Sequence, residues 1–446
     1  MATSNDVTTK LNFDILARMM TFITRGKHLL AVMRSCHALY QAGVLPLVRL
    51  AAWSVDEYRL SSFYAFMINH SPISFIVFDH LCISCREELS DAHNKMLIDL
   101  LERSTALQEL EVDSSAVLDM DSGVPQAIAS LTTLSSLTFS DPAAEEEINY
   151  ILANLHSPLD YVSVFFVDDC EDPVPLLANF RQTLEQATFI CVQLESTEFS
   201  YSRLTHLDLR LCYRPKLSVL MTAFPNLEDL KLDAGDHIGV DPEEHPELEA
   251  LRASNIQFQH DNGPMWKSLE SVTADIASLF MLGLHMEIDG LYVESSVGCD
   301  VDAAWLRATL TLVSPKTLRL SCWDSPAVLA QTFRVGMDNL ARLIVSLECR
   351  DCEEYQDLLD ALVTGLASVN TDSLVLNITR CYFGDSGHWD ATKRFFEQVG
   401  HKALADLIFP VVPNLKALEI NFGSSKRSSW IGWEEGNEKM WRNANE

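Results

Sequence analysis

Leucine and other apolar residues recur along most of this chain at the offsets i, i+3 and i+5. The stretch SRLTHLDLRLC shows the pattern with Leu204, Leu207 and Leu209. The same offsets begin at Leu107, Leu134, Leu159, Leu184, Leu227, Leu248, Leu269, Ile288, Pro315, Leu340, Thr371 and Leu415. Apart from the interval of 44 residues between the last two, successive starts stand 19 to 31 residues apart. That period is typical of repeats built from one strand and one helix or turn.

Amphipathic helices are predicted between these strand-like segments. AHNKMLIDLLERS before Leu107 and AAWLRATLTLV before Pro315 both carry apolar residues at i, i+3 and i+4. Neither a strand nor a helix of this kind can bury its apolar face alone, so stacked repeats must share one core. Each inward side chain would contribute ~1.5 to 3 kcal/mol when fully buried. The pattern predicts an α/β solenoid, and an ordinary α/β domain with leucine-rich strands is the alternative.

The repeated units resemble the leucine-rich repeat family, from about Phe75 to Gly423. That family places an Asn or Cys after the strand, which only Cys212 matches, so the predicted array is irregular. The resemblance implies a horseshoe with parallel strands on its concave side and helices on its convex side. The long interval between Thr371 and Leu415 holds either a degenerate unit or a loop followed by a helix.

Residues between the inward-facing positions should line the concave side, because side chains alternate along a strand. Arg and Tyr are frequent anchors of protein interfaces. The residues expected to contact a target protein are Tyr161, Phe165, His206, Arg210, Lys231, Arg252, Tyr292, Arg319 and Arg342. Acidic residues on an early strand, Glu109, Glu111 and Asp113, favour a target with a basic segment, unless they are simply solvated positions.

The residues from Leu11 to Arg49 predict two or three short helices, with more apolar side chains than so small a bundle can bury. Their spacing resembles the F-box family, which has apolar residues in helical register, a break, and then Leu-Leu, a Cys, a bulky residue and Pro-Leu. The matching residues are Leu11, Asp14, Leu16, Met19, Ile23, Leu29, Leu30, Val32, Cys36, Leu39, Pro46 and Leu47. Asn12 stands where that family usually has Pro, and Ser35 stands where Val is common.

F-box proteins with leucine-rich repeats are substrate receptors of cullin–RING ubiquitin ligases. The resemblance therefore implies that this chain binds a Skp-type adaptor, holds an unknown target protein and does no chemistry itself. The adaptor contacts that it implies are Leu11, Ile15, Leu16, Met19, Leu29, Leu30 and Leu39. The alternative is a non-ligase repeat scaffold or inhibitor, in which the N-terminal helices only cap the array.

The predicted organisation is an F-box-like helical domain, a linking helix, the repeat array and a C-terminal tail. Their ranges are 10–50, 51–72, 73–423 and 424–446. The tail contains Trp430, Trp433 and Trp441, which either cover the open end of the last repeat or contact the target.

Composition narrows the choice of partners. The chain has 33 basic and 63 acidic residues and a formal charge of −30, which argues against binding nucleic acid or an anionic membrane. We read no secretory signal and no membrane span, so we expect a cytoplasmic or nuclear protein. The 11 cysteines are expected to be free thiols.

The chain shows none of the common catalytic motifs, so no cofactor, metal or catalytic residue is expected. The pairs Cys82/Cys85 and Cys349/Cys352 have metal-ligand spacing, but they lie far apart in the chain.

Overall fold

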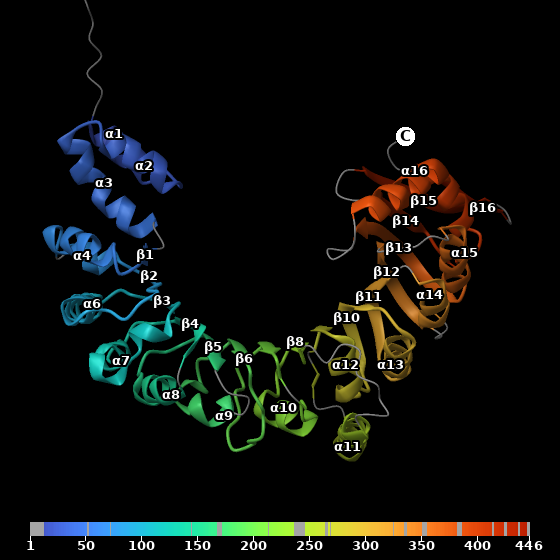
Figure 1. The fold of residues 1–446 in the computed structure, drawn as a ribbon, viewed down its shortest axis with the longest axis horizontal. Coiled ribbons are helices and arrows are strands. Elements are labelled where there is room, and N and C mark those ends of the chain that lie inside the picture. The colour runs from blue at the N-terminus through green and yellow to red at the C-terminus, as the bar shows by residue number, and fades with distance from the viewer. Residues whose placement is uncertain are drawn as a thin grey trace, which may run out of the picture. The chain divides into compact units, whose positions relative to one another are not determined.

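The computed structural model of the chain is an α/β solenoid in which strands and helices alternate along the sequence. The structure describes residues 13–443 except 51–52, 72, 144, 167–171, 213, 236–245, 264–265, 268, 324, 334–336, 350–354, 381–385, 413, 423–425 and 436–437. The chain forms two compact units: unit 1 comprises residues 1–168 and 176–187, and unit 2 comprises 169–175 and 188–446. In each unit the helices that alternate with the strands lie on one side of them (Figure 1).

Three helices open unit 1, as the sequence predicts: α1 (Phe13–Met20), α2 (Gly26–Met33) and α3 (His37–Leu50). Met20 and Met33 are at most 2% exposed and meet α3 at Gly43. A Cβ at Gly43 would lie 2.3 Å from Met33 Cγ and 2.5 Å from Met20 Cε. Glycine is therefore required where α3 crosses the other two helices.

Parallel strands of unit 1 pair in the order in which the chain forms them. They are β1 (Trp53–Val55), β2 (His80–Ile83), β3 (Glu109–Val112), β4 (Ser136–Ala143) and β5 (Tyr161–Phe166). The helices between them are α4 (Leu60–Asn69), α5 (Ile73–Val77), α6 (Asp91–Arg103), α7 (Val124–Ala129) and α8 (Glu145–Asn154). One continuous inward row joins all five strands, and its members, none more than 2% exposed, are Val55, Ile83, Val112, Phe139 and Val164.

Unit 2 repeats the same plan. Its parallel strands are β7 (His206–Arg210), β8 (Asp229–Asp233), β9 (Ser271–Ala274), β10 (Glu287–Val297), β11 (Ser314–Trp323), β12 (Met337–Cys349), β13 (Val369–Arg380) and β14 (Ala417–Phe422). The inward row that joins them, again at most 2% exposed, is Leu207, Leu230, Val272, Leu291, Leu318, Leu343, Leu374 and Leu418.

The helices of unit 2 are α10 (Leu217–Ala223), α11 (Pro246–Asn262), α12 (Ile276–Leu282), α13 (Asp300–Leu310), α14 (Pro326–Thr332), α15 (Tyr355–Leu366) and α16 (Ser386–Ile408). Two elements, α9 (Pro173–Leu176) and β6 (Gln186–Ile190), contribute residues to both units. The backbone departs from helical geometry at Gly400 in α16, with φ of 77°. A helix thus occupies much of the long interval before Leu415, as one of the two readings of the sequence expected.

A described strand overlaps every predicted strand segment except LEALRA, which starts at Leu248 and lies inside α11. The prediction of a strand there is wrong. Leu248 and Leu251 are spaced i, i+3, which suits a helix as well as a repeat strand. Pro246 begins the helix, and Glu, Leu, Ala and Arg are strong helix formers, so local preference selects the helix.

The ends of the array differ from the predicted ranges. The first parallel strand, β1, falls within residues 51–72, where the sequence predicts only a linking helix; that helix is α4. The predicted tail forms β15 (Lys426–Glu435) and β16 (Glu438–Asn443), which continue the sheet from β14 in antiparallel fashion. A three-residue strand such as β1 carries too short a pattern to be recognised by period alone.

Adjacent residues on β12 provide a direct test of the inward row. Leu343 is 0% exposed, whereas Arg342 is exposed on the opposite face. We expect Leu343→Ala to lower the free energy of unfolding by about 2–5 kcal/mol, because it leaves a cavity in the shared core. Arg342→Ala should change it by less than about 0.5 kcal/mol. Urea denaturation of both variants measures the difference, and equal destabilisation would refute this assignment of faces.

Candidate protein-binding surfaces

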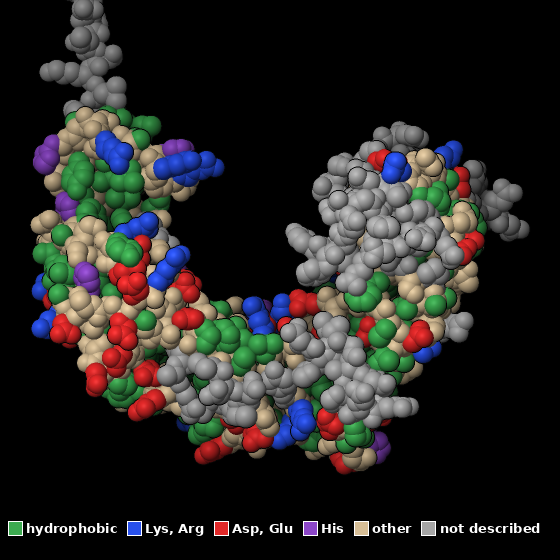
Figure 2. Space-filling view, in the orientation of Figure 1, with side chains coloured by type: hydrophobic (Ala, Val, Ile, Leu, Met, Phe, Trp, Pro, Cys, Tyr) green, Lys and Arg blue, Asp and Glu red, His purple; other side chains and the backbone are tan. Residues whose placement is uncertain are grey.

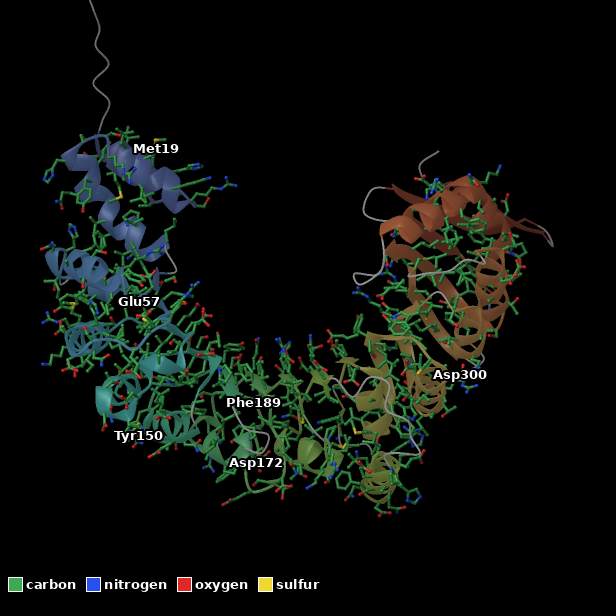
Figure 3. The ribbon with its side chains drawn as sticks, in the orientation of Figure 1. Met19, Glu57, Tyr150, Asp172, Phe189 and Asp300 are labelled. Carbon is green, nitrogen blue, oxygen red and sulfur yellow. The ribbon has the colours of Figure 1, made fainter. Side chains whose placement is uncertain are left out.

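Large apolar side chains are exposed on the first helix and the turn that follows it. Ile15, Met19 and Phe22 are 59%, 58% and 73% exposed. Ile15 and Met19, spaced i, i+4, lie on one side of α1, and Phe22 lies in the turn that follows it. We call these three residues the N-terminal apolar patch. Hydrophobic side chains are visible at the surface of this helical region in Figure 2, and Met19 is labelled in Figure 3.

The residues that the F-box resemblance assigns to adaptor binding divide into four groups. Ile15, Met19 and Leu30 are exposed, the last at 39%, and Leu16 is half-buried. Leu29 and Leu39 are only 0% and 7% exposed because they fill the core of the three-helix bundle, so the structure does not present them for docking. Leu11 lies outside the described residues. Phe22 was not among the predicted contacts, although the i, i+4, i+7 series from Ile15 identifies it.

The solvent-facing side of the strands, which we call the strand face, carries mostly paired charges. In unit 2, His206 Nε2 lies 2.9 Å from Asp229 Oδ2, and Arg210 Nη2 lies 2.7 Å from Asp208 Oδ2. Lys231 Nζ lies 2.8 Å from Glu294 Oε1. These predicted contact residues are on the strand face as expected, but the charges of Arg210 and Lys231 are compensated by neighbouring carboxylates, and the imidazole of His206 contacts another.

Two arginines of the strand face are not paired with carboxylates in this way. Arg319 on β11 and Arg342 on β12 are exposed, and neither forms an ion pair or a hydrogen bond with any residue that the structure describes. Arg342 is in register with Thr317, two residues before Arg319, so the two arginines occupy diagonal positions on neighbouring strands. We call them the arginine pair.

Tyr292 stands beside the arginine pair, because it is in register with Arg319. Its ring lies over Gly290, where a Cβ would come within 2.6 Å of Tyr292 Cε2. The glycine lets the tyrosine ring lie close to its own strand. Tyr161 and Phe165 are half-buried on β5 of unit 1 and therefore belong to a separate part of the strand face.

Arg252 was predicted to line the concave side, and this prediction is wrong because the residue lies on α11. Its Nη1 donates to the carbonyl oxygen of Phe280 (2.7 Å) and its Nη2 to that of Ala308 (2.8 Å). Its guanidinium carbon lies 4.5 Å from the centre of the Phe280 ring. Burial lowers the pKa of Arg252 from its usual value. The side chain joins α11 to α12 and α13, which is a structural role.

We expect Arg252→Ala to destabilise the fold by about 1–3 kcal/mol, because it leaves two helix carbonyls without a donor. Arg319→Ala, on the exposed strand face, should change stability by less than about 0.5 kcal/mol. Thermal unfolding followed by circular dichroism compares the two variants. A native-like melting temperature for Arg252→Ala would show that the two hydrogen bonds do not hold these helices.

The Cys82/Cys85 pair lies at β2, where burial raises the pKa of the Cys85 thiol to about 11 and also raises that of Cys82. Cys349 is buried, and Cys352 is outside the described residues. Across the part of the chain that the structure describes, no group of three or more His, Cys, Asp or Glu side chains is arranged to hold a metal ion. Among the same residues, no helix has the length and apolar character needed to cross a bilayer.

Comparison with known proteins gives no family, and among solved structures it gives distant likenesses. No protein-family model matches the chain, and no curated protein matches it either. Among solved structures it is similar to a chain of the Rad7 and Elc1 complex in yeast, with 12% sequence identity and a TM-score of 0.36. The similarity covers 83% of this chain and 91% of that chain. The fold assignment therefore rests on the strand order and pairing of this chain itself.

Proposed function

We propose that this protein is a substrate receptor of a cullin–RING ubiquitin ligase. In this proposal the N-terminal helices bind a Skp-type adaptor and the strand face of the array holds a target protein. The observation that carries it is the N-terminal apolar patch of Ile15, Met19 and Phe22, exposed on helices whose sequence resembles an F-box.

The exposure of this patch favours an adaptor-binding role over a simple cap. A helical cap places its apolar side chains against the end of the stack, as Leu47 at 5% exposure does here. Ile15, Met19 and Phe22 instead face solvent, and apolar surface arranged on one side of a helix marks a protein-binding site. The alternative of a capped scaffold leaves this surface unexplained.

In the proposed role the chain performs no chemistry. A receptor that holds its target beside a ubiquitin-charged enzyme raises the effective concentration of the reacting groups. The receptor therefore needs two binding surfaces and no catalytic residue. The N-terminal apolar patch and the strand face are separate surfaces, which is consistent with that requirement.

The arginine pair indicates what the unit 2 strand face prefers to bind. Arg319 and Arg342 have no ion-pair partner among the residues that the structure describes, in a chain with a formal charge of −30, and Tyr292 lies beside them. Arginine forms strong charge-assisted hydrogen bonds with carboxylates. We therefore assign an acidic segment of the target to this region. The acidic residues of β3 in unit 1 still suit a basic group, as the sequence suggests.

The adaptor contact is tested with the double variant Ile15→Asp/Met19→Asp. We expect it to lose co-elution with a purified Skp-type adaptor at micromolar concentrations while it keeps the stability of the unchanged chain, because both side chains are exposed. Tyr58→Asp is the matched control, since Tyr58 is an 80% exposed apolar residue elsewhere in unit 1. If the double variant still binds the adaptor, the N-terminal apolar patch is not the docking surface. If the unchanged chain fails to bind, the capped scaffold becomes the better account.

The proposal that the arginine pair binds an acidic segment of the target is tested with the double variant Arg319→Gln/Arg342→Gln. Each charge-assisted hydrogen bond is worth about 1.5–3 kcal/mol, so affinity for an acidic peptide should fall at least about tenfold. Fluorescence anisotropy with a Glu- and Asp-rich peptide, at low and high salt, measures the change. Arg210→Gln is the control, because Asp208 already neutralises that arginine on the same face. Equal effects of the control and the double variant would rule out a specific role for the arginine pair.

A further inference from the structure

A pocket of about 590 Å³ lies inside unit 1, where the N-terminal helices meet the first repeat. Helices α2 and α3, strand β1 and helix α4 all contribute to its wall. The volume falls within the range of about 300–1,000 Å³ that is usual for small-molecule sites. Its wall includes β1 but none of the residues predicted to contact a target.

Aromatic rings form much of the wall. The ring centroid of Trp53 lies 4.9 Å from that of Phe63 and 5.9 Å from that of Phe66, with interplanar angles of 36° and 35°. Tyr40 contributes a further ring from α3, and aliphatic side chains complete the lining. Such walls favour a flat apolar molecule, because stacked and tilted aromatic contacts add to the energy of apolar burial.

Arg59 is the one charged residue that lines the pocket. Its Nε lies 3.4 Å from Asp56 Oδ2, but neither terminal nitrogen donates a hydrogen bond to a described residue. Asp56 itself is not part of the wall, so the pocket contains a cation and no carboxylate. The side chain of Arg59 is 71% exposed, so an anion at the pocket would compete with Asp56 for its guanidinium group.

Other polar groups of the wall are also incompletely satisfied. The indole nitrogen of Trp53 is buried and has no hydrogen-bond acceptor among the described residues. Because that nitrogen is closed off from solvent, it does not present a donor to a molecule in the pocket. The hydroxyl of Ser62 donates to the Arg59 carbonyl at 2.8 Å and keeps its own acceptor capacity.

We propose that this pocket binds a small amphipathic molecule with a flat aromatic body and one anionic group. The body lies against Trp53, Phe63 and Phe66, and the anionic group pairs with Arg59. This site is additional to the adaptor and target surfaces, and its existence does not depend on the proposed ligase function.

The test uses the full chain and 8-anilinonaphthalene-1-sulfonate, a fluorescent aromatic sulfonate with the required chemistry. We expect saturable binding at one site per chain. Ser62→Trp places an indole in the pocket and should abolish binding, whereas Ser71→Trp, at an exposed position outside the wall, should not. A loosened, compact variant would bind more of this dye and not less, and far-UV circular dichroism of Ser62→Trp distinguishes loss of the site from unfolding.

The role of Arg59 is tested with Arg59→Gln and a neutral analogue of the dye, N-phenyl-1-naphthylamine. We expect the variant to bind the sulfonate at least about tenfold more weakly and the neutral analogue with unchanged affinity. Full binding of the sulfonate by Ser62→Trp would overturn the site. Equal weakening of both dyes, or of neither, would overturn the assignment of an anionic ligand.

Discussion

The structure depends on inward rows of side chains that run from strand to strand in register. Leu207 on β7 begins a row that continues without interruption to Leu418 on β14. No single repeat can bury its own strand or helix, so each member of the row is buried only because its neighbours are present. Since side chains alternate, the same register places the intervening residues, including Tyr292 and Arg319, on the opposite face.

The ends of such an array require a different solution, because the terminal repeats lack a neighbour on one side. At the N-terminal end of unit 1, helices α2 and α3 and the first repeat together line the aromatic pocket. At the C-terminal end of unit 2, β15 and β16 extend the sheet in antiparallel fashion. The N-terminal helices contain more apolar surface than this covering role uses, and the surplus is the N-terminal apolar patch.

The sequence was sufficient to predict the class of fold and the positions of most strands, because a period sustained over many repeats averages out local ambiguity. It failed at Leu248, where one short segment fits both a strand and a helix. That error also misplaced Arg252, whose role as a link between helices depends on Phe280 and Ala308, residues distant in sequence.

Individual contacts at the proposed sites were harder to predict than the fold. The F-box-like spacing located the helices but did not separate buried Leu29 from exposed Leu30. Which of two adjacent leucines points into the core depends on how the helix packs against its neighbours. Within the described part of the chain, Arg319 and Arg342 have no ion-pair partner, and this depends on strand register, which spacing alone does not give. The pocket is formed by four elements that come together only in the folded chain.

Site-specific photo-crosslinking to a Skp-type adaptor tests the central claim most directly, that the exposed N-terminal helices and the strand face have different partners. A photoreactive residue in place of Met19 should crosslink to the adaptor, and the same residue in place of Arg342 should not. Crosslinking from position 342, or none from position 19, would contradict the proposed division between the two surfaces.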